Sequence, residues 1–203
     1  MSYSAELCRL VICNMEILEE APSIVASVEA TLFAAIDERI KRRIEKQNNW
    51  EGVYSFSSGE EETTFAPKSW PKTKDADESC YAWYELDHTE DGEELDWLSS
   101  ATGLRNAALC LQFDVDMDLC GFKNAKEYKN RLLRFYAGAS VLHEAGFHFS
   151  EFYGVIYRPF AFDAGKLAEE YPDFDKALEP LDAALEDLFK AHDEFDKFVK
   201  GLE

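Results

Sequence analysis

Three strand-like segments follow one another in the middle of the sequence, with no helical pattern between them. They occupy residues 50–57, 80–87 and 106–116, and each is rich in aromatic or β-branched side chains. Parallel neighbours in a sheet need a crossover connection, which is usually a helix. The order of the segments therefore indicates an antiparallel or mixed sheet with helices packed on it.

The segment 106–116 shows the clearest alternation of apolar and polar side chains. One side carries Leu109, Leu111, Phe113 and Val115, and the other carries Cys110, Gln112, Asp114 and Asp116. Side chains two residues apart on a strand share a face. The pattern predicts a strand with one face in the core and one face toward solvent.

Helical periodicity precedes this block of strands. Residues 5–19 and 22–47 predict two N-terminal helices. The second is expected to begin at Pro22, because a proline has no N–H and the first helical position leaves that group unpaired anyway. The segment 59–79 holds two prolines and few aliphatic residues, so it is expected to be a long surface loop.

The second half of the chain predicts one more helix, a pair of strands and two further helices. Residues 124–145 predict a helix capped by Asn124 and stopped by Gly146. Residues 147–162 predict two strand pieces with a bend near Gly154 or Pro159. Two helical segments follow at 163–170 and 173–200, and a kink or break is expected at Pro180.

We therefore predict one α+β domain over residues 1–203. It has N-terminal helices (1–49), a mostly antiparallel or mixed sheet of about four to five strands with one inserted helix (50–162), and C-terminal helices (163–203). The chain is 46% hydrophobic and 14% aromatic. A chain of this length and composition can bury a core without a metal or a disulfide.

Charge is the most unusual property of the composition. The chain has 41 Asp and Glu against 21 Lys and Arg, a net charge of −20. Residues 51–120 alone carry 17 acidic and four basic residues, a net charge of −13. Such a surface repels phosphate backbones and anionic membranes, so we expect no direct nucleic-acid or membrane binding. It attracts a basic protein instead.

The leading hypothesis is an acidic protein-binding or inhibitory module that docks a basic partner. Immunity proteins, antitoxin-like inhibitors and DNA mimics share this profile of charge and size. Tryptophan concentrates interface energy, and carboxylates attract cations. The candidate partner-binding residues are Trp70, which the flanking loop residues suggest is exposed, and Glu93, Glu94, Asp96, Asp114, Asp116 and Asp118.

A metal-dependent hydrolase is the first alternative. Asp114, Asp116 and Asp118 share one face if the strand continues through them, and carboxylates bind hard cations. His88 or His143 would complete such a site. A calcium loop starting at Asp114 fails, because Leu119 and Ala125 stand where that loop needs Gly and Glu.

Other catalytic motifs are absent from the sequence. His143 and His148 are five residues apart, whereas the zinc-protease helix needs four. The acid-x-Lys triplet at 127–129 falls in a predicted helix rather than on a strand. The sequence contains no phosphate-binding glycine loop, dinucleotide fingerprint or serine elbow, so no cofactor is predicted and a non-enzymatic role is favoured.

A structural or assembly subunit is the second alternative, in which the aromatic stretch 147–162 is buried against another copy. The five cysteines include no pair with the two-residue separation of zinc or redox sites. The first ten residues lack the basic-then-apolar order of a signal peptide, and a cytoplasmic location is expected.

Overall fold

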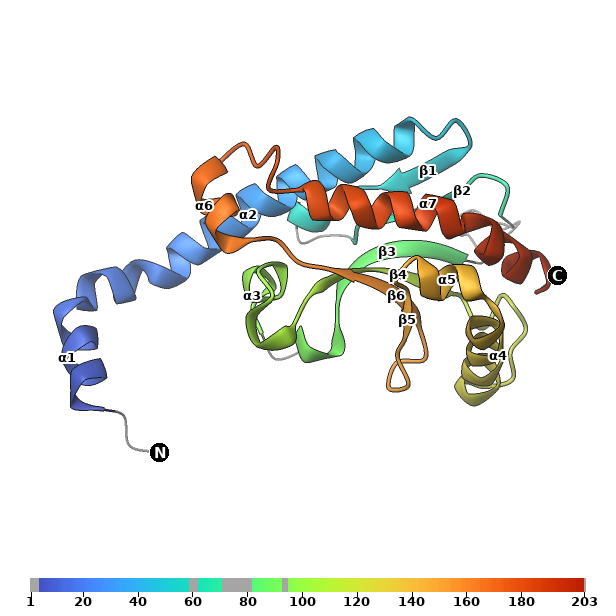
Figure 1. Ribbon diagram of the computed structural model, residues 1–203, viewed down its shortest axis with the longest axis horizontal. Coiled ribbons are helices and arrows are strands. Elements are labelled where there is room, and N and C mark those ends of the chain that lie inside the picture. Colours follow the sequence, from blue (N-terminus) through green and yellow to red (C-terminus); the bar gives the residue numbers. More distant parts are fainter. Residues whose placement is uncertain (1–3, 59–61, 71–81, 93–94, 203) are drawn as a thin grey trace.

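The computed structural model describes residues 4–58, 62–70, 82–92 and 95–202 (Figure 1). Within them, six strands form one antiparallel sheet in the order β1-β2-β3-β4-β6-β5, and helices pack around it. This confirms the predicted α+β class, with slightly more strands than the four to five expected. The strands are β1 (Trp50–Val53), β2 (Thr64–Pro67), β3 (Ala82–His88), β4 (Leu109–Val115), β5 (His148–Phe149) and β6 (Ile156–Phe160).

Strand β2 corrects the prediction that 59–79 is only a loop. Its four residues pair with β1 on one side, and Thr64 and Phe65 pair with β3 on the other. Phe65 and Ala66 are buried in consequence. The segment has little strand propensity of its own, so its conformation comes from the two partner strands.

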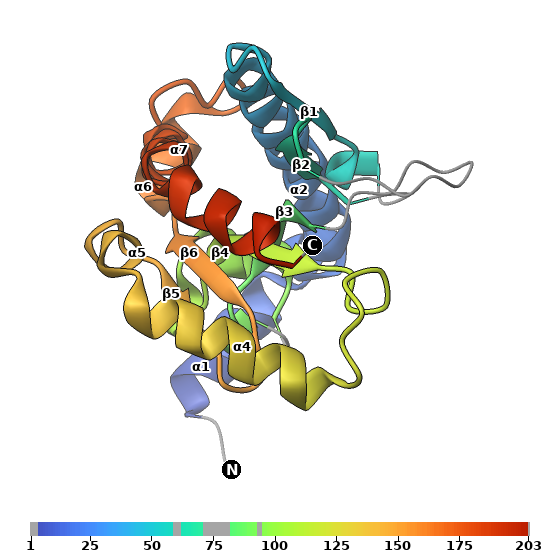
Figure 2. The same cartoon turned by 90° about the vertical axis from the view of Figure 1, so that its right-hand side faces the viewer.

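The alternation of β4 is confirmed for its core side, which defines the core face of the sheet, whereas Cys110 on the side expected to face solvent is also buried. Leu109, Leu111 and Phe113 are 0% exposed, and Tyr84 and Leu86 of β3 lie on the same face. Helices α2 (Met15–Glu45) and α7 (Glu179–Lys200) cover this face, as Figures 1 and 2 show. Phe195 of α7 packs on the Phe113 ring at a centroid distance of 4.8 Å.

The N-terminal helices divide at a different residue from the one predicted. Helix α1 (Ala5–Cys13) ends where the Asn14 side chain donates a hydrogen bond to the Leu10 carbonyl, at 2.7 Å. Helix α2 then runs through Pro22 instead of beginning there. This part of α2 is exposed, so water can satisfy the carbonyl that the proline leaves without a donor.

The remaining helices are short, apart from α4 and α7. They are α3 (Trp97–Ala101), which was not predicted, α4 (Ala125–Gly138), α5 (Ser140–Glu144) and α6 (Ala164–Glu170). Asn124 caps α4 as predicted by accepting from the Glu127 N–H, at 3.0 Å. The expected break at Pro180 is present, because α7 begins there with the proline in its first turn. Gly154, at φ +76°, lies in the turn between β5 and β6 as expected.

The first part of the chain projects away from this body (Figure 1). Of the residues from Ser4 to Thr31 whose burial is described, none is buried, and Leu32 is the first core residue of α2. We call residues 4–28 the N-terminal arm. Within the described residues, no helix combines the length and apolar character needed to cross a membrane.

Candidate functional site

The face of the sheet opposite the core carries acidic side chains on two neighbouring strands. Glu85 and Asp87 of β3 and Asp114 of β4 alternate with the core residues and point to this side, which we call the polar face. Glu85 Oε1 accepts a hydrogen bond from Gln112 Nε2 and its Oε2 accepts one from Trp83 Nε1, both at 2.9 Å. The side chain is therefore held in place.

Burial and mutual repulsion shift the protonation of these carboxylates. The pKa of Glu85 is raised from 4.5 to about 7, mainly by burial. The Trp83 hydrogen bond opposes this shift, and the charges of Asp114, Asp87 and Glu62 add to it. The pKa of Asp114 is raised as well, first by burial and then by neighbouring carboxylates. A proton or another cation is therefore favoured at this face.

No described lysine or arginine pairs with this charge, and Asp87 has the ring of His88 beside it at 3.2 Å. Among the residues that the structure describes, Glu62, Glu85 and Asp114 form no ion pair. The arginines lie elsewhere: Arg158 bonds Asp187 of α7 at 2.9 Å, and Arg39 bonds Asp175 at 2.9 Å. These two described arginines thus pair with carboxylates outside the polar face.

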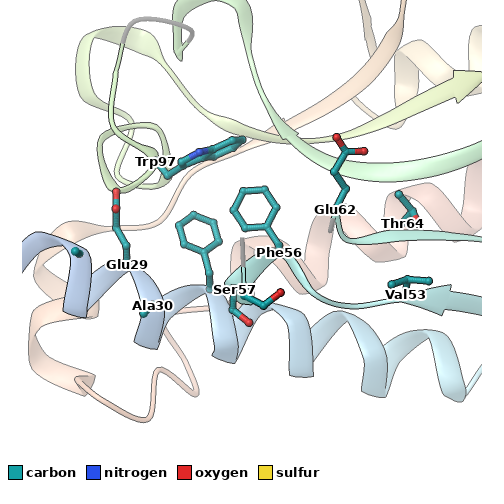
Figure 3. A pocket seen from close by; sticks show the side chains of 11 residues that line it. Glu29, Ala30, Val53, Phe56, Ser57, Glu62, Thr64 and Trp97 are labelled. Atoms are coloured by element: carbon teal, nitrogen blue, oxygen red, sulfur yellow. The ribbon is translucent and has the colours of Figure 1, made fainter. Parts of the chain in front are cut away.

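A groove of about 910 Å³ opens beside the polar face, between α2, α3 and the β1–β2 end of the sheet (Figure 3). Glu29 and Trp97 lie at one end, Glu62 and Thr64 lie at the other, and Phe56 stands between them. Among its described lining residues, the two glutamates are the charged ones. The groove therefore combines carboxylates at both ends with aromatic walls.

The walls of the groove are fixed by packing and hydrogen bonds. The Phe56 and Trp97 rings meet edge to face at 4.6 Å, and Glu29 Oε1 accepts from the Leu98 N–H of α3 at 2.8 Å. Beneath the groove, buried Asp37 of α2 accepts from the Ser57 N–H at 2.9 Å.

The same Asp37 carboxylate accepts from the Thr63 hydroxyl. Its two bonds anchor the 3-10 turn η1 (Phe56–Ser58) and the residue that precedes β2 to the long helix α2. The shape of the groove thus exists before any ligand binds.

Glu62 belongs to both regions. It lines the groove, and its charge raises the pKa of Glu85 and of Asp114 on the polar face. We call the groove and the polar-face carboxylates together the acidic surface, defined by Glu29, Glu62, Glu85, Asp87 and Asp114.

The structure separates the candidate residues predicted from sequence. Asp114 lies in the acidic surface, and Asp96 is exposed just before α3. Glu93 and Glu94 lie outside the described residues. The expectation of an exposed Trp70 is wrong: the side chain is 2% exposed, and its Nε1 lies 3.3 Å from Asp196 of α7.

The expected ladder of three aspartates is also wrong. Strand β4 ends at Val115, so only Asp114 is on the strand. Asp116 Oδ1 accepts from the backbone N–H groups of Asp118 and Leu119, each at 2.9 Å, and this closes a turn. The Asp116 carboxylate therefore stabilises the chain reversal.

The histidines named for a metal site are apart from these aspartates. The His88 ring stacks on Trp97 at 4.6 Å and contacts Asp87, while His143 contacts the Tyr136 carbonyl at 3.0 Å. Within the described parts of the chain, no three His, Cys, Asp or Glu side chains are placed to hold a metal ion.

The aromatic stretch 147–162 serves mainly the chain's own core. Phe147, Phe160 and Phe162 are buried, and the exposed aromatic residues Phe152 and Tyr153 lie at the turn between β5 and β6. The folded chain therefore cannot bury the whole stretch against another copy, because part of it already lies in its own core.

The candidate residues predicted from the sequence do not include four members of the acidic surface. Glu85 and Asp87 alternate with aromatic and aliphatic residues in 82–88, as the residues of 109–115 do, so the same argument finds them. Glu29 and Glu62 join the site through tertiary packing and carry no local signal. Comparison of the chain with known protein families, with curated proteins and with solved structures gives no match.

Proposed function

We propose that this protein is a binding module that docks a basic protein partner on its acidic surface. The observation that carries the proposal is Glu62, which joins a preformed groove to half-buried carboxylates without a described cationic neighbour. The partner group that fits is a lysine or arginine side chain presented on a protein segment.

The carboxylates of the acidic surface raise one another's pKa before any partner binds. Carboxylates that are partly buried and close together repel one another, and a bound cation removes that repulsion. Arginine forms paired hydrogen bonds with a carboxylate and stacks on aromatic rings. Trp97 and Phe56 between Glu29 and Glu62 provide both kinds of contact.

The net charge of the chain adds a long-range contribution. A net charge of −20 accelerates the encounter with a basic protein, and the rate falls as salt screens it. Hydrogen-bonded carboxylates in the groove then add specificity to this attraction.

The test compares two charge reversals that change the net charge equally. We expect Glu62→Lys to weaken the binding of a fluorescent Lys/Arg-rich peptide by about 10–100-fold, because it places a cation inside the acidic surface. Glu151→Lys lies at the exposed turn between β5 and β6 and should change affinity by less than about 3-fold. The measurement is fluorescence anisotropy at several salt concentrations.

The slope of affinity against salt separates local from general attraction. Wild type and Glu151→Lys should lose affinity steeply with salt, and Glu62→Lys should lose it less steeply. Equal affinities and slopes for both variants would sink the proposal, because binding would then follow net charge alone.

A further inference from the structure

The N-terminal arm exposes a row of apolar side chains along α2. Ile17, Leu18 and Ile24 are 61%, 44% and 50% exposed, and Ala21, Val25 and Val28 continue the row at helical spacing. On α1, Leu10 and Ile12 are 61% and 71% exposed.

An isolated helical arm of this kind is only marginally stable in water. Most helices in proteins depend on packing of their apolar face, and no arm residue whose burial is described is buried against the body. The arm therefore requires a surface to cover its apolar side.

A matching surface lies at the base of the arm on the same chain. An apolar groove of about 540 Å³ between α2, α3 and α6 is lined by Leu32, Leu98, Leu167 and Tyr171 among others. A shallower groove continues from it along α2 past Ile24, and the two share Val28 and Tyr171. Each chain thus offers an apolar arm and an apolar groove that runs onto that arm.

We infer that two copies of this chain pair through their arms, antiparallel about Ala21, with α1 of each copy in the apolar groove of the other. Such an arrangement is two-fold symmetric and closes as a dimer. It uses the arm and the groove on both copies at once.

The arm charges are compatible with this alignment. Residues equally distant from Ala21 on opposite sides face each other, so Leu18 meets Ile24 of the second copy. Glu16 then faces Ala26, and Glu19 faces Ser23. No glutamate of the arm opposes a glutamate, which like-charge repulsion would disfavour.

The lengths also agree. The start of α2 lies six residues before Ala21, or about 9 Å along the helix axis. That brings Asn14, which lies between α1 and α2, level with Val28 of the second copy, where its apolar groove begins. The part of the arm on α2, residues 15–28, is about 20 Å long and about 11 Å wide and covers roughly 220 Å² in projection, and α1 in the groove adds to it. Stable interfaces bury about 800 Å² on each partner.

The first test is sedimentation of the full chain. We expect a dimer at micromolar concentrations, and a dissociation constant at least about 30-fold weaker for Leu18→Lys and for Ile24→Glu. The double variant Leu18→Lys/Ile24→Glu should regain the dimer, because the two new charges face each other. Phe152→Lys, an exposed apolar position outside the arm, is the matched control and should stay dimeric.

A second test fixes the alignment by disulfide formation. In a chain with Cys8→Ser and Cys13→Ser, Ala21→Cys should cross-link to its own counterpart on oxidation, and Ala26→Cys should not. A monomer at about 100 µM would overturn the inference, and so would a dimer in which Ala21→Cys fails to cross-link. Added salt should leave the dimer intact, unlike the binding of a basic partner, so the two proposals can fail separately.

Discussion

The raised pKa of Glu85 makes the acidic surface measurable through stability. The substitution is Glu85→Gln, which removes the charge and keeps the size of the side chain. Trp83 and Gln112 each donate a hydrogen bond to Glu85. In the variant, the Gln112 amide can rotate so that its oxygen accepts from the side-chain amide at position 85. The change thus tests charge more than packing.

The magnitude follows from the pKa of Glu85, which burial raises from 4.5 to about 7. Between these values the folded protein holds a proton that the unfolded chain releases. The free energy of unfolding therefore falls as the pH rises through 7. At about 1.4 kcal/mol for each pH unit, wild type loses roughly 2 kcal/mol from this group between pH 5.5 and pH 8.5.

The assay is urea denaturation of wild type and Glu85→Gln at both pH values. We expect the loss between them to shrink by roughly 2 kcal/mol in the variant. At pH 8.5 the variant should be about 1–2 kcal/mol more stable, after about 1 kcal/mol for weaker hydrogen bonds. Exposed Glu151→Gln is the control and should leave both values unchanged. An unchanged pH dependence in Glu85→Gln would show that the Glu85 carboxyl does not gain a proton on folding.

Three further predictions follow from the same contacts. Affinity for a Lys/Arg-rich peptide should fall as the pH is lowered from 8 to 6, because Glu85 gains a proton near pH 7. Fluorescence anisotropy measures this affinity, and an affinity that rises at low pH would contradict the prediction. Asp37→Ala should lower the free energy of unfolding, measured by urea denaturation, by about 2–4 kcal/mol, because it leaves the Ser57 N–H and the Thr63 hydroxyl without their acceptor. The same variant should also weaken peptide binding. Full stability in this variant would show that the groove does not depend on Asp37. Trp70→Ala should cost about 3–5 kcal/mol, because the side chain is buried, whereas Trp70→Phe should keep peptide affinity; a selective loss of binding in Trp70→Phe would return this residue to the interface.

The parts of the fold that sequence predicts are those with a local signal. The alternation of 109–115 places β4 and its buried face correctly, and Asn124 caps its helix as expected. Strand β2 is missed, because its four residues become a strand only between two partners distant in sequence. Pro22 misleads for a related reason: an exposed helix tolerates a proline that a buried one would not.

The candidate site divides in the same way. Asp114 and Glu85 can be found from strand alternation alone. The burial of Trp70 depends on α7, which lies more than 100 residues later in the chain and returns to cover it. Glu29 and Glu62 line opposite ends of a groove that exists only after α2, α3 and the sheet have packed together.

The most direct test of the acidic surface is an amide and indole NMR titration of the protein with a Lys/Arg-rich peptide. We predict that the largest shift changes occur at Glu62, Thr64, Glu85 and the Trp97 indole, which line the groove and the polar face. Shift changes spread over the exposed acidic residues of α7, or absent from the groove, would contradict the account.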